Sequence, residues 1–226
     1  MIGLPVTFIR LAGCNLTCPW CESKETWNKP CRHEEIAYDS SYEMRASQMH
    51  CTKCGASGTL EELETLTTVP AIAKYKWMSI EQIQELANKE IVVVTGGEPC
   101  MHDLVPLFEA LNPNHFTCIE TNGTLPTPEN VGWVVASPKP PEYLIHGQCF
   151  FNELKYVVDE EFNTDCIPKD ALKNMFGAIW LQPCHYGDGA ENEKRTADSW
   201  QRCYNLAMQE ENLRVGIQMH KMLNVR

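Results

Sequence analysis

The sequence has little positive charge and no long hydrophobic run. Its 226 residues include 19 Lys and Arg against 30 Asp and Glu, which gives a formal net charge of −11. Non-specific nucleic-acid binding needs a basic surface, so we expect no nucleic-acid partner. A membrane-spanning helix needs roughly 18 or more consecutive apolar residues, and no run approaches that length, so we expect no membrane association either.

A secretory signal is also missing. The opening MIGLPVTFIR has neither a basic segment nor the long apolar segment of a signal peptide, so we expect a cytoplasmic protein. Twelve cysteines are many for such a chain, and six of them fall within residues 14–54. In a reducing compartment this clustering indicates metal binding before disulfides. The length predicts a single domain, 1–226, with one insertion.

Three cysteines form the most informative motif. Cys14, Cys18 and Cys21 are spaced C-x3-C-x2-C after a β-rich stretch at 5–11. Thiolates are the usual ligands of iron–sulfur clusters, and three of them leave one iron of a cubane cluster open to a small molecule. The alternatives are a zinc site, which usually takes four ligands in C-x2-C pairs, and a disulfide with a free thiol, which needs an oxidising compartment.

The rest of the chain alternates between helical spacing and apolar runs. This pattern predicts an α/β fold with a largely parallel sheet of about six strands after the first, and parallel sheets place active sites at the carboxyl ends of their strands. The expected strands are 91–94, 116–121, 133–137, 153–158, 178–183 and 213–220, and the expected helices are 79–89, 103–112, 168–176 and 196–210.

Small or polar residues end four of these strands. They are Thr95 to Pro99 (TGGEP), Glu120 to Gly123 (ETNG), Ser137 to Lys139 (SPK) and Gln182-Pro183. Paired glycines let a ligand approach the backbone closely. One such segment alone is compatible with a simple turn, but four in succession predict a ligand site at this edge of the sheet.

The cysteine motif with a downstream GGEP resembles the radical S-adenosylmethionine superfamily. Within it, FIRLAGCNLTCPWCESKETWNK, VVVTGGEPCMHDLVPL, IETNGT, ASPK, ELKYVV, WLQP and IQMHKMLNVR are similar in order and spacing to the 7-carboxy-7-deazaguanine synthase family, over nearly the whole chain. The resemblance implies a partial TIM-type barrel and a lyase of queuosine and deazapurine synthesis. Its reaction converts 6-carboxy-5,6,7,8-tetrahydropterin to 7-carboxy-7-deazaguanine with loss of ammonia, through a 5′-deoxyadenosyl radical that takes hydrogen from C6.

The resemblance also implies roles for individual residues. Cys14, Cys18 and Cys21 would hold a [4Fe–4S] cluster, and Arg10 would pair bidentately with the substrate carboxylate. Ser23 would ligate Mg2+ where relatives carry Thr. Thr95, His220 and Arg226 would also contact substrate. The expected S-adenosylmethionine contacts are Trp20, Cys21, Glu22, Gly96, Gly97, Glu98, Ser137, Pro138, Lys139, Gln182, Pro183, Cys184 and His185. Among these, Glu98 is expected to shape the amine pocket and not to act as a base.

The expected partners are a pterin substrate, an external electron donor such as flavodoxin, and a second copy of the chain in a homodimer. Two other functions stay open. A glycyl-radical-activating enzyme shares C-x3-C-x2-C but acts on a protein backbone, and should lack ASPK and HKMLNVR. A non-catalytic zinc-binding regulatory protein would use residues 28–60 as a docking surface.

Two segments depart from the family pattern. The polar insertion 28–76 carries Cys31, His33, Cys51 and Cys54, which could close a structural zinc site. His50 is an alternative to His33, and an auxiliary iron–sulfur cluster or unliganded cysteines are the alternatives to zinc. At the amino terminus, relatives begin with an extra strand and a Gln-Gly-Glu-Gly turn that contacts the pterin. This chain has no match for them, and we expect a truncated start.

Overall fold

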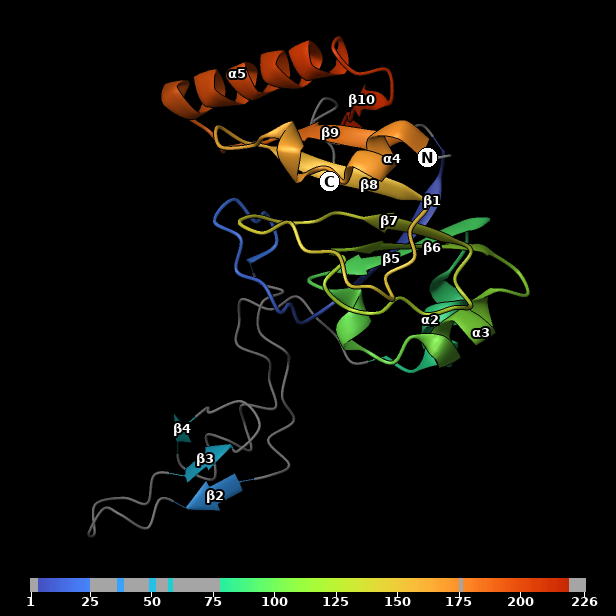
Figure 1. The fold of residues 1–226 in the computed structure, drawn as a ribbon. Coiled ribbons are helices and arrows are strands. Elements are labelled where there is room, and N and C mark those ends of the chain that lie inside the picture. Colours follow the sequence, from blue (N-terminus) through green and yellow to red (C-terminus); the bar gives the residue numbers. More distant parts are fainter. Residues whose placement is uncertain are drawn as a thin grey trace.

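A sheet of seven parallel strands, in the order β1-β5-β6-β7-β8-β9-β10, carries the fold (Figure 1). The computed structural model describes residues 4–24, 36–38, 49–51, 57–58, 78–174 and 177–219. The strands are β1 (Val6–Leu11), β5 (Ile91–Gly96), β6 (Phe116–Thr121), β7 (Trp133–Ala136), β8 (Glu153–Val158), β9 (Ile179–Pro183) and β10 (Leu213–Val215). The expected parallel α/β fold is therefore confirmed.

Side chains alternate between the two faces of the sheet. On β5, Val92 and Val94 are completely buried under helices, whereas Val93 and Thr95 face the concave side. On β8, Tyr156 is completely buried on the helix side and Lys155 faces the concave side. Successive residues of a strand point to opposite faces, so one face builds the core and the other can line a site.

Helices cover the outer face in two groups (Figure 1). The helix α5 (Ala190–Ala207) packs on β8, β9 and β10, and α3 (Val105–Leu111) packs on β6 beside α2 (Ile80–Leu86). A Ser79 capping box starts α2: the Ser79 hydroxyl accepts from the Gln82 amide, and the Gln82 side chain accepts from the Ser79 amide. The remaining short elements are η2 (Pro99–Met101), η3 (Thr164–Cys166) and α4 (Lys169–Asn174).

The sheet curves but does not close. Its edge strands are β1 and β10, which do not pair with each other within the described part of the chain. The result is the partial barrel that the family resemblance implied, open along one seam. None of the helices that the structure describes is long and apolar enough to cross a membrane.

Three expectations about the elements need correction. Helix α5 begins at Ala190, six residues before the expected start, because the polar run 190–195 gives no apolar periodicity to detect. Strand β10 ends at Val215 and not at 220. Within the insertion, where no strand was expected, β2 (Ile36–Tyr38), β3 (Met49–Cys51) and β4 (Ser57–Gly58) form a small antiparallel sheet. Strands of two or three residues are too short to show alternation.

Candidate active site

A cavity of about 830 Å³ occupies the concave side of the sheet. The cysteine loop, residues 12–21, lies at the carboxyl ends of the strands and forms part of its wall. The expected site residues that line this cavity are Arg10, Cys14, Cys18, Trp20, Cys21, Glu22, Ser23, Thr95, Gly96, Gly97, Ser137, Lys139, Gln182, Pro183, Cys184 and His185. Residues from 10 to 185 in the sequence thus meet in one place.

Several expected site residues lie elsewhere. Glu98 and Pro138 are buried outside the cavity lining. His220 and Arg226 lie outside the described residues, and so do three of the four cysteine and histidine ligands expected in the insertion, Cys31, His33 and Cys54. The fourth, Cys51, belongs to strand β3, where the structure describes the backbone and not the side chain.

The three motif thiols are half-buried on the cavity wall. Burial raises the pKa of the Cys14 and Cys18 thiols. Within the described residues, no three His, Cys, Asp or Glu side chains converge closely enough to share one metal ion. A cubane cluster spreads its irons over separate corners, so its thiolates stand further apart than ligands of a single zinc ion. Three thiols on the wall of a cavity form a donor set of the kind that iron–sulfur clusters take.

Backbone contact with the end of β5 holds the cysteine loop. The Gly97 amide donates to Leu11 O (3.1 Å) and the Glu98 amide donates to Gly13 O (2.7 Å). A Cβ on Gly96 would come within 2.1 Å of Leu11 O, and one on Gly97 within 2.2 Å of Gly13 O. The glycine pair therefore permits a close approach between two backbone segments, in addition to any role toward a ligand.

Side chains extend this contact to the end of β6. Asn122 donates to Asn15 Oδ1 (2.9 Å), and Asn15 in turn donates to the Thr124 hydroxyl (2.8 Å). On the other side, the His102 ring bonds to Ala12 O (2.7 Å). The loop is thus anchored to the ends of both β5 and β6.

Glu98 organises these anchors from behind the cavity. Its carboxylate is completely buried and accepts three hydrogen bonds, from the Cys100 amide (2.9 Å), the Thr121 hydroxyl (2.7 Å) and the Asn122 amide (2.6 Å). All three partners present an N–H or O–H group to the carboxylate oxygens. Glu98 therefore joins the end of β5 to the end of β6, and a base at this place would not face a ligand in the cavity.

Lys139 supplies a cation close to the cysteine loop. Its ammonium donates to Ser137 O (2.6 Å) and to the Ser137 hydroxyl, and lies 5.8 Å from the centre of the Trp20 ring. Burial, together with the positive charge of Lys155, lowers the pKa of Lys139 to about 8. Among the described residues no carboxylate forms an ion pair with Lys139, so the site holds a cation whose pKa is about 8.

A charged pair that the sequence reasoning missed lies on the cavity floor. Glu120 on β6 and Lys155 on β8 face the cavity and form a 3.0 Å ion pair across β7. The positive charge of Lys155 lowers the pKa of the Glu120 carboxyl. The register places Arg10 opposite Thr95 on the neighbouring strands. A lysine flanked by apolar or aromatic residues on both sides in the strand ELKYVV was the signal that could have identified Lys155.

Arg10 on the cavity floor contacts Ser23 of the segment after the cysteine loop. The guanidinium of Arg10 donates to the Ser23 hydroxyl at 3.0 Å. These two residues were expected to contact the substrate carboxylate and Mg2+, respectively, and the structure places them in direct contact with each other.

Comparison with known proteins gives consistent relatives, although no family model matches the chain. The 7-carboxy-7-deazaguanine synthase of Escherichia coli K12 is 31% identical over 235 residues, which cover 99% of this chain and 91% of that protein. The enzyme of the same name from Synechocystis is 29% identical over 97% of this chain and 83% of its own length. The crystal structure of QueE from Escherichia coli superposes with a TM-score of 0.57 at 26% identity, covering 93% of this chain and 84% of that one.

Proposed function

The chain belongs to the 7-carboxy-7-deazaguanine synthase family, and on that premise we propose that it catalyses the radical ring contraction of 6-carboxy-5,6,7,8-tetrahydropterin to 7-carboxy-7-deazaguanine with release of ammonia. The observation that carries the proposal is the cavity in which the three motif cysteines meet the polar ends of β5, β7 and β9. Ser137 and Lys139 of the ASPK motif line that cavity, which favours this reaction over the activation of a glycyl radical in a protein.

Cys14, Cys18 and Cys21 are the residues that would hold a [4Fe–4S] cluster with one open iron. The cluster and S-adenosylmethionine, when bound, supply the radical chemistry that removes a hydrogen atom from the substrate. The chain itself supplies binding and orientation. The Lys139 ammonium lies on the cavity wall near the cysteine loop, where a carboxylate of the cofactor would find a cation.

The floor of the cavity would receive the pterin. Arg10 offers a planar guanidinium suited to a carboxylate, and Thr95 lies opposite it on the adjacent strand. Glu120 offers acceptor oxygens beside them, held by Lys155. A pterin carries both a carboxylate and ring N–H donors, so a floor with both charges suits its two kinds of polar group.

Magnesium fits this arrangement poorly. The Ser23 hydroxyl is engaged by the Arg10 guanidinium, whose charge would repel a divalent cation on the same oxygen. We therefore derive no step through Mg2+, and we infer that Ser23 orients Arg10. Turnover measured with a chelator and with added Mg2+ tests this inference, since a strict Mg2+ requirement would contradict it.

Three further expectations remain predictions of this proposal. The zinc site at Cys31, His33, Cys51 and Cys54 predicts about one zinc per chain beside the cluster iron. The electron donor and the homodimer follow from the family likeness alone. On the anaerobically purified protein, metal analysis measures the zinc content and light scattering measures the oligomeric state.

The central experiment incubates the reconstituted protein with the carboxytetrahydropterin, S-adenosylmethionine and a reductant. We expect the deazapurine product by mass and ultraviolet spectrum, and 5′-deoxyadenosine on prolonged incubation. A Cys18→Ala variant is expected to form neither. Cleavage of S-adenosylmethionine without any deazapurine would overturn the substrate assignment.

A further inference from the structure

The cysteine loop has a contact on the side away from β5 and β6. The indole Nε1 of Trp20, the residue before Cys21, donates to Asp159 Oδ2 at 3.1 Å. Trp20 lines the main cavity and also a second cavity of about 540 Å³, which the loop after β8 and the start of α5 share. The Trp20 ring therefore stands between two cavities, and Asp159 is the group that holds its polar edge.

Asp159 is the first residue after β8, and its carboxylate is oriented on both sides. Oδ2 receives the indole, while Oδ1 accepts from the Glu161 amide at 3.1 Å. An aspartate side chain that accepts a hydrogen bond from the backbone amide two residues ahead forms an Asx turn, which fixes the direction of its carboxylate. The position of the carboxylate thus depends on the shape of the loop 159–162.

Arg202 on α5 holds that loop by its backbone. Its guanidinium donates to the carbonyls of Asp159 (3.3 Å), Glu160 (2.5 Å) and Phe162 (2.5 Å). A planar guanidinium can serve several acceptors from fixed directions, whereas an ammonium acts as a point charge. The three carbonyls that Arg202 binds lie within four residues, so their arrangement suits a guanidinium better than an ammonium.

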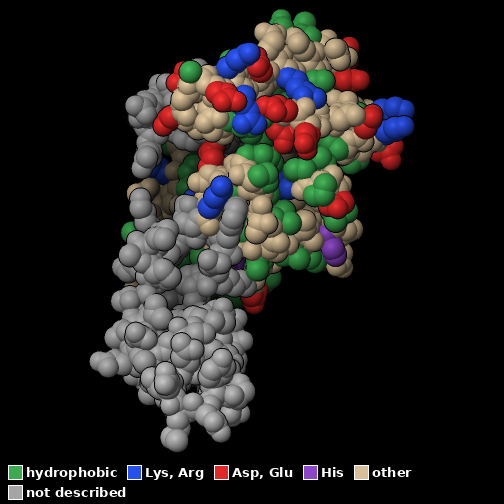
Figure 2. All heavy atoms as spheres, turned by 90° about the vertical axis from the view of Figure 1, so that its left-hand side faces the viewer, with side chains coloured by type: hydrophobic (Ala, Val, Ile, Leu, Met, Phe, Trp, Pro, Cys, Tyr) green, Lys and Arg blue, Asp and Glu red, His purple; other side chains and the backbone are tan. Residues whose placement is uncertain are grey.

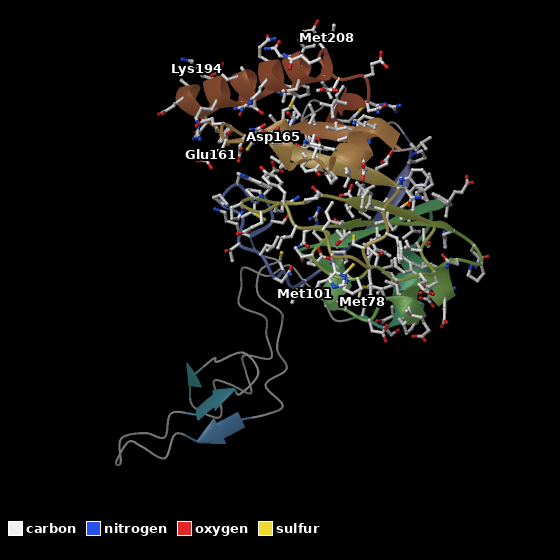
Figure 3. The ribbon with its side chains drawn as sticks, in the orientation of Figure 1. Met78, Met101, Glu161, Asp165, Lys194 and Met208 are labelled. Carbon is white, nitrogen blue, oxygen red and sulfur yellow. The ribbon has the colours of Figure 1, made fainter. Side chains whose placement is uncertain are left out.

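Ser199, one turn before Arg202 on α5, bonds the same end of the sheet. The buried Ser199 hydroxyl donates to Val158 O (2.6 Å) at the end of β8 and accepts from the Cys184 amide (2.8 Å) after β9. Figure 3 shows Glu161 of the loop beneath the half of α5 that carries Lys194. Figure 2 shows acidic and basic side chains mixed over this face, with no single sign dominating. The contacts of α5 with the loop are therefore specific ones, and not a general electrostatic attraction.

We propose that Asp159 and Arg202 are positioning residues for the cysteine loop: Arg202 shapes the loop after β8, so that Asp159 holds the Trp20 indole and with it the backbone at Cys21. The inference rests on the proposed function, because it gives Cys21 the role of a cluster ligand. Neither Asp159 nor Arg202 touches the thiols. Their effect reaches the site through a chain of hydrogen bonds that begins on an 18-residue helix packed on the core.

The test compares variants of the full chain, reconstituted anaerobically. Trp20→Phe keeps a ring and removes the N–H, Asp159→Ala removes the acceptor, Asp159→Asn keeps an acceptor oxygen, and Arg202→Gln removes the guanidinium. Gln201→Ala, at an exposed position on the same helix, is the matched control. The readouts are iron per chain, the EPR spectrum of the reduced cluster with and without S-adenosylmethionine, and KM and kcat for cofactor cleavage.

We expect Trp20→Phe, Asp159→Ala and Arg202→Gln each to raise KM for S-adenosylmethionine about five-fold, as loss of one charge-assisted hydrogen bond would, and to change the EPR spectrum with the cofactor bound. The Gln201→Ala control should stay within about two-fold of wild type, and Asp159→Asn, which keeps one acceptor oxygen for two donors, should lie between the control and Asp159→Ala. The double variant Trp20→Phe with Asp159→Ala should be no worse than the poorer single variant, because both break one contact.

Additive losses in the double variant overturn the inference. So do wild-type KM and EPR spectra in Asp159→Ala and Arg202→Gln, whatever their melting temperatures. If only Trp20→Phe loses iron, while Asp159→Ala and Arg202→Gln bind as much iron as wild type, the effect comes from the indole ring and not from its hydrogen bond. That result also overturns the inference. If the wild-type protein itself binds no cluster, the proposed function is contradicted. The iron content of the wild-type protein therefore distinguishes failure of the proposed function from failure of this inference.

Discussion

Replacement of Glu98 by Gln tests whether this carboxylate is a structural acceptor at the junction of β5 and β6. The wild-type side chain accepts hydrogen bonds from the Cys100 amide, the Thr121 hydroxyl and the Asn122 amide, at 2.6–2.9 Å, with no exposure to solvent. Glutamine has one acceptor oxygen, and its other end is an NH2 group. In either orientation that group faces a donor.

The cheaper orientation keeps the oxygen toward Cys100 and Thr121 and turns the NH2 toward the Asn122 amide. One hydrogen bond to a charged group is then lost and a buried N–H is left without an acceptor, at a cost of about 1.5–3 kcal/mol. The neutral amide is easier to bury than the carboxylate, which offsets part of the cost. We expect the free energy of unfolding to fall by about 2 kcal/mol.

Urea unfolding measures this change. With a slope of about 2 kcal/mol per molar urea, the midpoint should fall by about 1 M with the slope unchanged. Glu109→Gln, an exposed position on α3, is the control and should lie within about 0.5 kcal/mol of wild type. Equal midpoints for Glu98→Gln and Glu109→Gln, under the same cluster loading, would refute the reasoning.

Three other predictions concern the cavity. Lys155→Met leaves Glu120 without its ion-pair partner, so KM for the pterin should rise about two- to five-fold. The charge-swapped double variant, Glu120→Lys with Lys155→Glu, should recover part of this loss. Equal KM values in the single and double variants would argue against the pair. Since Lys139 has its pKa lowered to about 8, it is charged below that pH and neutral above it. The kcat/KM for S-adenosylmethionine should therefore fall above about pH 8, and Lys139→Arg should keep its activity to a higher pH; identical profiles would count against a role for the ammonium. Gly97→Ala would place a Cβ 2.2 Å from Gly13 O, so the cysteine loop must shift. Iron per chain after reconstitution should then drop well below that of wild type. Full iron loading would contradict the close approach of the two backbone segments.

Much of the fold follows from local sequence patterns. The strand 116–121 and the strand 153–158 begin and end where the apolar runs predicted, and Ser79 starts its helix as expected. These features depend on residues near one another in the chain, so a single sequence can reveal them. Helix α5 shows the limit, because its polar first turns carry no periodic signal.

The location of the site follows from the same patterns, whereas its internal contacts do not. Once the sheet is parallel, the carboxyl ends of its strands must lie along one edge, so the polar residues at the ends of β5, β7 and β9 were bound to meet. Which side chains pair is a different matter. Arg10 contacts Ser23, thirteen residues away, and Glu120 pairs with Lys155 across an intervening strand. The individual ligand roles of the cavity residues remain predictions.

The sequence by itself determined the parallel sheet and the three-cysteine loop, because each is encoded in spacing over a few residues, and its motifs resembled one family along nearly the whole chain. Only the tertiary structure decided that Glu98 is enclosed behind the cavity, and that Asp159 and Arg202 reach the cysteine loop through Trp20. Trp20 and Asp159 lie 139 positions apart, and Arg202 lies 40–43 positions from the carbonyls that it binds. These contacts depend on how far the sheet curves and on where α5 packs across it, and no local pattern of residues specifies either distance.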